Sequence, residues 1–250
     1  MRKKSKLDIF VIGPYKDYAS WMNGNLVNDI ALADLVWLTG GEDINPEIYK
    51  QPCGSRTHFS EKRDDMELQL MKEAVDYGIP MFGTCRGAQL LCAYAGGSLV
   101  QHMSHPYNHL ITLWDGTVLE TNSLHHQLQF PFSMARDKYE ILGWANGISH
   151  THLNGNDERM LLPTGKNNVS VIEPELVYYR ELKALGIQGH PEMINKNSKL
   201  VKILTALVLQ LIEGNMDNII HVGMGVNKLL SLSEKDINII VLEEEEPSVY

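Results

Sequence analysis

Buried apolar runs alternate along the chain with segments whose apolar residues recur at helical spacing. Runs typical of strands buried on both faces occur at 7–13, 35–39, 79–83 and 184–189. Helical spacing of apolar residues follows in three segments, 63–77, 88–95 and 200–211. Because the strand at 79–83 follows the first of these helices directly, the pattern predicts a strand–helix–strand crossover and a parallel sheet.

The helix predicted over 63–77 has an acidic first turn and ends at Gly78. We interpret Asp64 and Asp65 as structural residues that suit the positive end of that helix. Its apolar residues recur at helical spacing: Met66, Leu70, Met71, Ala74 and Val75. The apolar stripe of the helix over 200–211 is interpreted as core packing.

The sequence pattern changes between 110 and 177, where short predicted strands are separated by Asp-Gly and Asn-Gly turns. It predicts an antiparallel meander. The expected fold is therefore α/β, with a mostly parallel central sheet flanked by helices and a smaller antiparallel β region. We expect one domain over 1–214 and a C-terminal extension over 215–250, with a possible strand at 237–242 and an acidic end. The role of this extension is left open: it can be an added strand, an oligomer contact or a mobile tail.

Composition narrows the classes of protein that need to be considered. The 250 residues are 44% hydrophobic and 21% charged, which is ordinary for a globular chain, and the formal net charge of −9 argues against a nucleic-acid-binding surface. The sequence contains no run of about 18 apolar residues, so no membrane span is expected. The basic N-terminus lacks the features of a signal peptide. The three cysteines form no disulfide framework, so a cytoplasmic location is expected.

The sharpest chemical signal is a strand that runs into Gly83-Thr84-Cys85-Arg86-Gly87 and then into a helix. Such a turn holds the side chain of Cys85 out of the sheet, and the helix N-terminus favours its thiolate. The backbone N–H of Arg86, in the first helical turn, is placed to donate to an oxyanion. Gly83 and Gly87 are expected to let this backbone pass close to a substrate. Cys85 is the candidate nucleophile; the alternative is a small buried hydrophobe.

Two other segments suit the same chemistry. Gly40-Gly41 ends a predicted parallel strand, where ligands collect in open sheets, although an ordinary turn would have the same sequence. His190 and Glu192 lie two apart in an extended segment, so they can share a face, with the carboxylate orienting the imidazole. Chance produces a lone His-x-Glu often.

Five other histidines fall in two groups. His102, His105 and His109 raise the question of a metal site, but they lack a helical i, i+4 pair and a nearby cysteine or carboxylate cluster. We expect them to be surface or substrate-loop residues, and we predict no metal and no cofactor. Spacing alone leaves open whether His125 and His126 face a cleft or solvent.

Together these segments resemble the class I glutamine amidotransferase-like superfamily, and within it the peptidase C26 or γ-glutamyl-γ-aminobutyrate hydrolase branch. The resemblance spans roughly 35–213, and the order and spacing of its motifs make it specific. The matching motifs are LTGGEDINP at 38–46, Arg63-Asp64 with Glu67, GTCRGAQ at 83–89, GGSL at 96–99, NSLHHQ at 122–127 and GIQGHPE at 186–192.

The resemblance implies a flavodoxin-like fold and a catalytic triad of Cys85, His190 and Glu192. It also implies an oxyanion hole from the backbone N–H groups of Gly41 and Arg86. The substrate-binding residues that it implies are Gly40, Gln89, Ser123, His125 and His126. The implied reaction is hydrolysis of a γ-glutamyl amide through a γ-glutamyl thioester.

The chain departs from the branch at Cys92, His102 and Gly189, where asparagine, an acidic residue and tryptophan are usual. All three are expected near the cleft, which puts the substrate in doubt more than the reaction. The expected partner is a small γ-glutamyl substrate or glutamine. Alternatives are a glutaminase subunit that supplies ammonia to a separate synthetase, and a catalytically silent binding or scaffold protein. A homodimer is left open.

Overall fold

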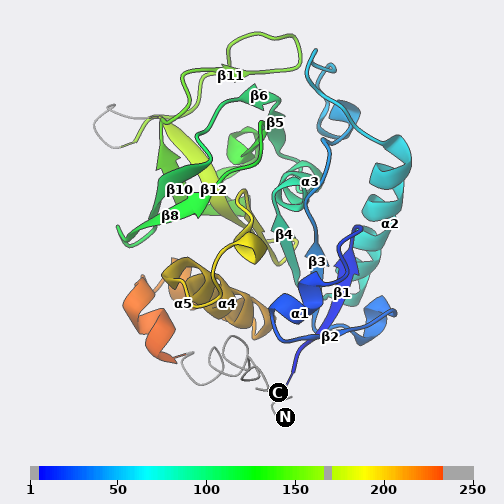
Figure 1. The fold of residues 1–250 in the computed structure, drawn as a ribbon, viewed down its shortest axis with the longest axis vertical. Helices are drawn as coiled ribbons and strands as arrows, with labels where there is room; N and C mark the ends of the chain where they lie inside the picture. Colours follow the sequence, from blue (N-terminus) through cyan, green and yellow to red (C-terminus); the bar gives the residue numbers. More distant parts are fainter. Residues whose placement is uncertain (1–5, 166–170, 233–250) are drawn as a thin grey trace, which may run out of the picture.

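A nine-stranded sheet organises the residues that the computed structural model describes, 6–165 and 171–232 (Figure 1). One half is parallel, in the order β2 (Asn25–Leu26), β1 (Asp8–Ile12), β3 (Leu35–Leu38), β4 (Met81–Thr84) and β13 (Ala184–Ile187). This is the flavodoxin-like order. The sheet continues antiparallel through β12 (Ile172–Tyr179), β10 (Tyr139–Asn146), β7 (Asn108–Leu113) and β8 (Val118–Asn122). The α/β fold is confirmed, and the antiparallel region is part of the central sheet.

Two short ladders extend the antiparallel half. β5 (Ser98–Val100) pairs with β9 (Leu128–Phe130), and β6 (His102–Met103) pairs with β11 (His152–Leu153). Short 3₁₀ turns connect the elements: η1 (Ile30–Leu32), η2 (Pro46–Tyr49), η3 (Pro131–Ser133), η4 (Arg136–Lys138) and η5 (Pro191–Met193).

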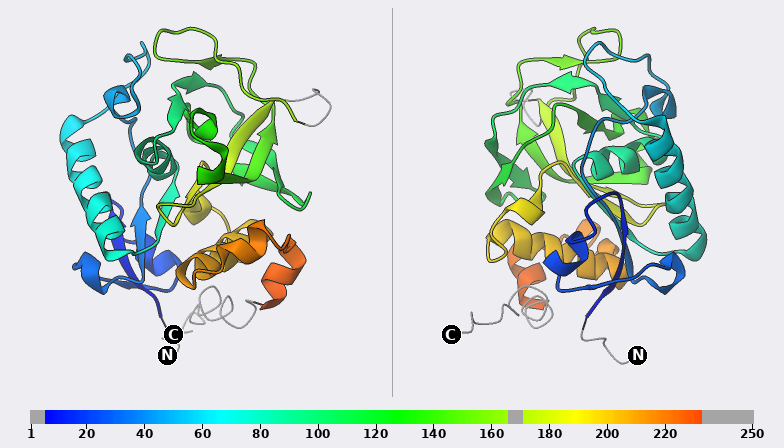
Figure 2. Two further views of the ribbon diagram at one scale, coloured as in Figure 1. Left: turned by 180° about the vertical axis from the view of Figure 1, so that it is seen from behind. Right: turned by 45° about the vertical axis from the view of Figure 1, so that its right-hand side comes forward.

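Helices cover both faces of the parallel half. α2 (Glu61–Tyr77) and α3 (Arg86–Tyr94) contribute to one apolar core. α1 (Tyr18–Trp21), α4 (Lys199–Ile212) and α5 (Met216–Ile220) contribute to the core on the opposite face. The right-hand view of Figure 2 shows α2 and α4 on opposite sides of the sheet. The carboxyl ends of the parallel strands lie between these two layers, at the edge where α/β proteins bind ligands.

Helix α2 begins earlier than its apolar pattern predicts and buries a narrower stripe. Ser60 caps its first turn, and Gly78 ends it with a φ of +70°. Met66 and Val75, two of the apolar positions in the helical pattern, are 53% and 37% exposed and lie outside the core. Asp64 and Glu67 occupy inward positions of the helix instead, because both carboxylates pair there with a buried arginine.

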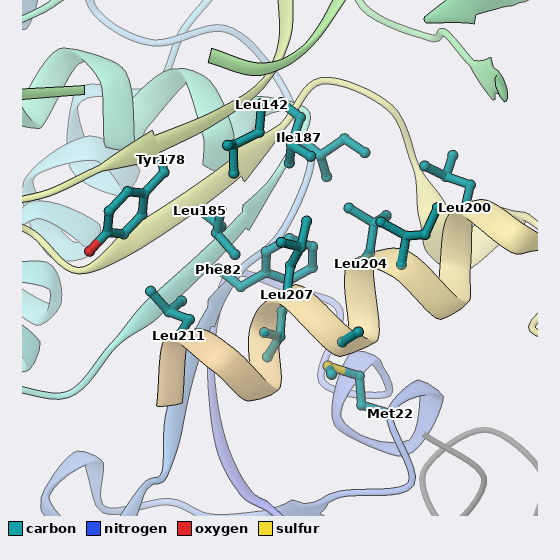
Figure 3. Close-up of a cluster of buried hydrophobic side chains, with 14 of the residues drawn as sticks. Met22, Phe82, Leu142, Tyr178, Leu185, Ile187, Leu200, Leu204, Leu207 and Leu211 are labelled. Carbon is teal, nitrogen blue, oxygen red and sulfur yellow. The ribbon is translucent and has the colours of Figure 1, made fainter. Parts of the chain in front are cut away.

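Helix α4 packs its leucine stripe against the strands that lead to the candidate catalytic residues (Figure 3). Phe82 of β4 and Leu185 and Ile187 of β13 lie in the same buried cluster. The core interpretation of this stripe is confirmed for all five of its residues: Leu200, Ile203, Leu204, Leu207 and Leu211.

The chain beyond α4 packs on the same core. The buried residues of this segment are Met216, Ile219, Val226 and Leu229. Trp114 Nε1 donates to the carbonyl of Met224 at 2.9 Å, and the amide of Val226 donates to Asp115 at 2.8 Å. The domain boundary at 214 stays a prediction, and the strand predicted at 237–242 lies outside the described residues. In the described part of the chain, no helix is long and apolar enough to cross a membrane.

Candidate active site

Cys85 occupies a strained turn between β4 and α3. Its φ of +51° and ψ of −110° are rare for a residue with a side chain. The residue is 6% exposed. Because Arg86 is the first residue of α3, the first N–H groups of that helix lie next to Cys85 and have no partner within the helix.

The glycines on either side of Cys85 make the turn possible by close backbone packing. A Cβ at Gly83 would lie 2.5 Å from the carbonyl carbon of Gly87, and a Cβ at Gly87 would lie 2.3 Å from the oxygen of Leu38. At both glycines the space that a side chain would need is therefore filled by the protein's own backbone. These glycines lock the turn against itself and against β3.

His190 follows β13, the parallel neighbour of β4. Thr84 and Ile187 are register partners, so the segments that follow both strands leave the same edge of the sheet. The side chain of Asn122 accepts from the His190 amide at 2.7 Å and donates to the His190 carbonyl at 3.0 Å. This two-point contact fixes the backbone of His190.

Glu192 and Tyr18 orient the imidazole of His190. Nδ1 of His190 lies 2.6 Å from Oε1 of Glu192, so the sequence-predicted His-x-Glu pair is in contact. The hydroxyl of Tyr18 donates to the same oxygen at 2.5 Å. Tyr18 was missed by the sequence reasoning because it lies in a polar segment without periodicity.

The charges around His190 favour its protonated form. Burial alone would lower the pKa of His190, but hydrogen bonds and charge interactions with Cys85 and Glu192 raise the pKa to about 10. Burial and the hydrogen bond to Glu192 raise the pKa of the Tyr18 hydroxyl, which therefore stays a donor. A protonated imidazole beside Cys85 is the partner that a thiolate nucleophile requires.

The turn at Gly40-Gly41 lies against the same pair. A Cβ at Gly40 would lie 2.8 Å from Cε1 of His190 and 3.7 Å from the Cβ of Cys85. The guanidinium of Arg63 holds this turn by donating to the Gly40 carbonyl at 3.0 Å and to the Glu42 carboxylate at 2.7 Å. Gly41, with a φ of +153°, lies against that guanidinium, where a Cβ would be 2.2 Å from Nη1.

A buried ion network joins this turn to the nucleophile helix. Nε of Arg63 donates to Oε1 of Glu67 at 2.7 Å, and Arg86 donates to the other oxygen of Glu67. Arg86 also donates to Asp64, whose second oxygen accepts from the amide of Asn45 at 2.9 Å. The two expected oxyanion donors, Gly41 and Arg86, are thus linked through Glu67. The sequence signal for this network was the Arg63, Asp64 and Glu67 spacing on one helix.

The other residues expected to bind substrate have different surroundings. Gln89 is buried and donates to the carbonyl of Gln127 at 3.0 Å, while Ser123 Oγ is buried without a hydrogen-bond partner. His126 is partly exposed and bonds Asp43, next to the Gly40-Gly41 turn, at 2.9 Å. His125 is buried, with Nδ1 2.8 Å from the Gln127 carbonyl, and its other nitrogen faces Glu175.

The three departures from the family pattern are not equivalent. Cys92 lies in the apolar core, with its thiol donating to the Ser98 carbonyl, and burial raises its pKa to about 12. The expectation that it lies near the cleft was wrong. A Cβ at Gly189 would lie 2.5 Å from Thr121 Oγ1 and 3.0 Å from the Asn122 carbonyl, which leaves no room for a tryptophan. The ring of His102 lies beside that of His126, with centroids 5.8 Å apart.

Two of the loop histidines were also placed wrongly by the sequence reasoning. The side chains of His105 and His109 are buried, and they contact carboxylates of β12. Among the described residues, one group offers three ligand atoms within 4.8 Å of one another: His105, His125 and Glu175. The spacing of the histidines did not indicate this group, because its carboxylate lies in β12, more than sixty residues after His105.

Comparison with known proteins places this arrangement among the class I glutamine amidotransferase-like proteins. The chain belongs to the peptidase C26 family, whose model matches residues 22–192.

Individual relatives support the assignment. The chain is 33% identical to Protein NtpR of Enterococcus hirae over 181 residues, which cover 66% of this chain and 69% of the relative. It is 28% identical to the glutamine amidotransferase-like protein YvdE of Lactococcus lactis over 171 residues, 67% of this chain and 70% of the relative. Among solved structures, the glutaminase domain of Trypanosoma brucei CTPS with bound acivicin has a TM-score of 0.51 at 12% identity. That match covers 84% of this chain and 94% of the domain, and it shows the fold alone.

Proposed function

We propose that this protein hydrolyses γ-glutamyl amide bonds through a Cys85–His190–Glu192 triad. The observation that carries the proposal is the His190 imidazole, bonded to Glu192 at 2.6 Å and raised in pKa by hydrogen bonding to Cys85. Family membership supports a hydrolytic or amidotransferase enzyme. The γ-glutamyl substrate and the catalytic roles of the three residues are our proposal, and glutamate release tests both.

The proposed reaction proceeds in two halves. The Cys85 thiolate attacks the γ-carbonyl carbon and forms a tetrahedral oxyanion. Its collapse breaks the C–N bond, His190 gives its proton to the departing amine, and a γ-glutamyl thioester remains on Cys85. Neutral His190 then takes a proton from water, whose attack on the thioester forms glutamate and regenerates the Cys85 thiolate and the His190 imidazolium.

The surrounding groups suit the charges that develop in these steps. We assign oxyanion stabilisation to the backbone N–H groups of Gly41 and Arg86. Glu192, held by Tyr18, keeps Nδ1 of His190 as a donor, so that Nε2 remains for Cys85. Substrate binding is assigned to groups around the nucleophile: Gly40, Gln89, Ser123 and His126. We do not assign a substrate contact to His125, because its free nitrogen faces Glu175.

The test is glutamate release by the purified protein alone, measured with glutamine and a panel of γ-glutamyl amines. Cys85→Ser is the inactive variant, and Cys53→Ser is the matched control because Cys53 is an exposed free thiol. We expect turnover of a γ-glutamyl amine well above that of glutamine, unchanged in Cys53→Ser and abolished in Cys85→Ser.

Two other outcomes would contradict the proposal. Weak turnover of glutamine alone would indicate a glutaminase subunit that supplies ammonia to a separate synthetase. Turnover of any of these substrates that survives in Cys85→Ser would exclude Cys85 as the nucleophile.

A further inference from the structure

A second cluster of titratable side chains is buried in the antiparallel half of the molecule. Its residues come from the 104–107 loop, β7, the 123–127 loop, β11 and β12. Figure 1 shows β10, β12 and β8 of the antiparallel half at the left of the view, with α2 at the right. The cluster consists of four imidazoles and two carboxylates: His105, His109, His125, His152, Glu173 and Glu175. The proposed reaction uses none of them.

The two carboxylates of this cluster differ in how they are satisfied. Glu173 accepts from the backbone amides of Ile148 at 2.8 Å and Ser149 at 3.0 Å. It also accepts from Nε2 of His152 at 2.7 Å and Nε2 of His105 at 3.2 Å. Its charge is therefore fully compensated by four donors.

Glu175 is only half satisfied. Its Oε1 accepts from Nε2 of His109 at 3.2 Å, but its Oε2 is buried with no hydrogen-bond partner. Nδ1 of His105 lies 3.4 Å from Oε1 of Glu175 and Nε2 of His125 lies 3.9 Å from it, and both nitrogens also have no hydrogen-bond partner. The Glu175 carboxylate and two buried, unpartnered ring nitrogens thus converge on one point.

The partners on the far side of each ring decide what these nitrogens offer. Nε2 of His105 faces the Glu173 carboxylate, and Nδ1 of His125 faces the Gln127 carbonyl at 2.8 Å, so each of these nitrogens must carry a proton. In the neutral imidazoles, Nδ1 of His105 and Nε2 of His125 therefore present lone pairs toward Glu175. Metal-binding histidines are oriented in the same way, by donating the other ring N–H to a carboxylate or a backbone carbonyl.

We propose that Nδ1 of His105, Nε2 of His125 and the Glu175 carboxylate bind a Zn²⁺ ion. Ligands at about 2.0–2.2 Å from a tetrahedral zinc lie about 3.4 Å apart. The three ligand atoms lie within 4.8 Å of one another, so small side-chain rotations bring them to this geometry. Two imidazoles and one carboxylate favour zinc over Mg²⁺ or Ca²⁺, which take oxygen ligands.

The site would join three parts of the chain that are distant in sequence. It would fix the 123–127 loop to β12, and His126 of that loop bonds Asp43 beside the Gly40-Gly41 turn. The role assigned to the ion is therefore structural. It compensates the buried charge of Glu175 and holds the loop that borders the candidate active site.

The test is Zn²⁺ and Co²⁺ titration of the full chain in a Cys85→Ser background, because a Cys–His pair can itself bind zinc. We expect one equivalent of Zn²⁺ per chain and a rise in the unfolding temperature. We also expect a Co²⁺ spectrum without a thiolate charge-transfer band. In Glu175→Gln and His125→Ala, Zn²⁺ affinity should fall by about 100-fold or more. Loss of a residue that only supports a metal ligand already lowers affinity by about 10–100-fold, and these two variants remove a ligand itself.

The matched controls are Glu120→Gln, at an exposed position of β8, and His102→Ala, outside the cluster; both should bind zinc as the Cys85→Ser parent does. Circular dichroism of each apo variant shows whether it is folded, and the two ligand variants provide independent readings. The proposal would be overturned if the Cys85→Ser chain bound no Zn²⁺ at micromolar concentration. It would also be overturned if folded Glu175→Gln or His125→Ala bound Zn²⁺ as tightly as the parent.

Discussion

The substitution Glu67→Gln tests whether the buried ion network carries the stability of the loop and helix that it joins. Glu67 is 1% exposed and accepts from Arg63 with one oxygen and from Arg86 with the other. Glutamine replaces one acceptor with an NH₂ donor that faces a guanidinium donor, and it removes the charge that both arginines share.

The magnitude follows from what remains after the substitution. Removing one partner of a buried ion pair costs about 3–5 kcal/mol, because the other charge is left buried. Arg86 keeps Asp64 and Arg63 keeps Glu42, so we expect the lower end, about 3 kcal/mol. For a chain of this size that corresponds to a fall in unfolding temperature of about 6–12 °C.

Urea unfolding and calorimetry of Glu67→Gln measure this cost, with Asp65→Asn as the matched control. Both substitutions remove one negative charge from α2, but Asp65 is exposed and should change the free energy of unfolding by less than about 0.5 kcal/mol. If Glu67→Gln and Asp65→Asn were equally stable, the network would contribute nothing and this reasoning would be refuted.

Three further predictions concern the triad and the core. Folding raises the pKa of His190 from about 6.5 to about 10, so its contribution to stability should be complete below pH 6.5 and be lost as pH rises toward about 10. Urea unfolding across this range should show a steeper decline in the free energy of unfolding for the wild type than for His190→Gln. Tyr18→Phe removes a donor to Glu192 and should lower kcat about tenfold with KM unchanged; equal kcat values would exclude a positioning role. Leu204→Ala should lower the free energy of unfolding by about 2–5 kcal/mol, and a smaller loss would mean that α4 relaxes around the cavity.

The sequence was most informative where function depends on neighbours along the chain. The turn at Cys85 and the contact between His190 and Glu192 follow from local geometry. The structure shows both, with a positive φ at Cys85 and a distance of 2.6 Å between Nδ1 of His190 and Oε1 of Glu192. The parallel half of the sheet was likewise predictable, because continuous apolar runs separated by amphipathic helices have few other solutions.

What the sequence did not reveal depends on contacts between distant segments. Tyr18 and Glu192 are 174 positions apart, and His105 and Glu173 are 68 apart, so no spacing rule connects them. Met66 also belongs to the apolar periodicity of α2 but is exposed, whereas ion pairing buries Asp64 and Glu67. Polar groups buried by long-range pairing look like surface residues in a hydrophobic pattern.

The most direct test of the proposed chemistry is to trap the covalent intermediate. The protein would be mixed with the γ-glutamyl amine that it turns over fastest, quenched in acid and examined by intact-protein and peptide mass spectrometry. A γ-glutamyl group on the peptide that contains Cys85, absent from Cys85→Ala, is the result that the proposed mechanism predicts. Turnover without an adduct in the wild type, together with activity in Cys85→Ala, would contradict it.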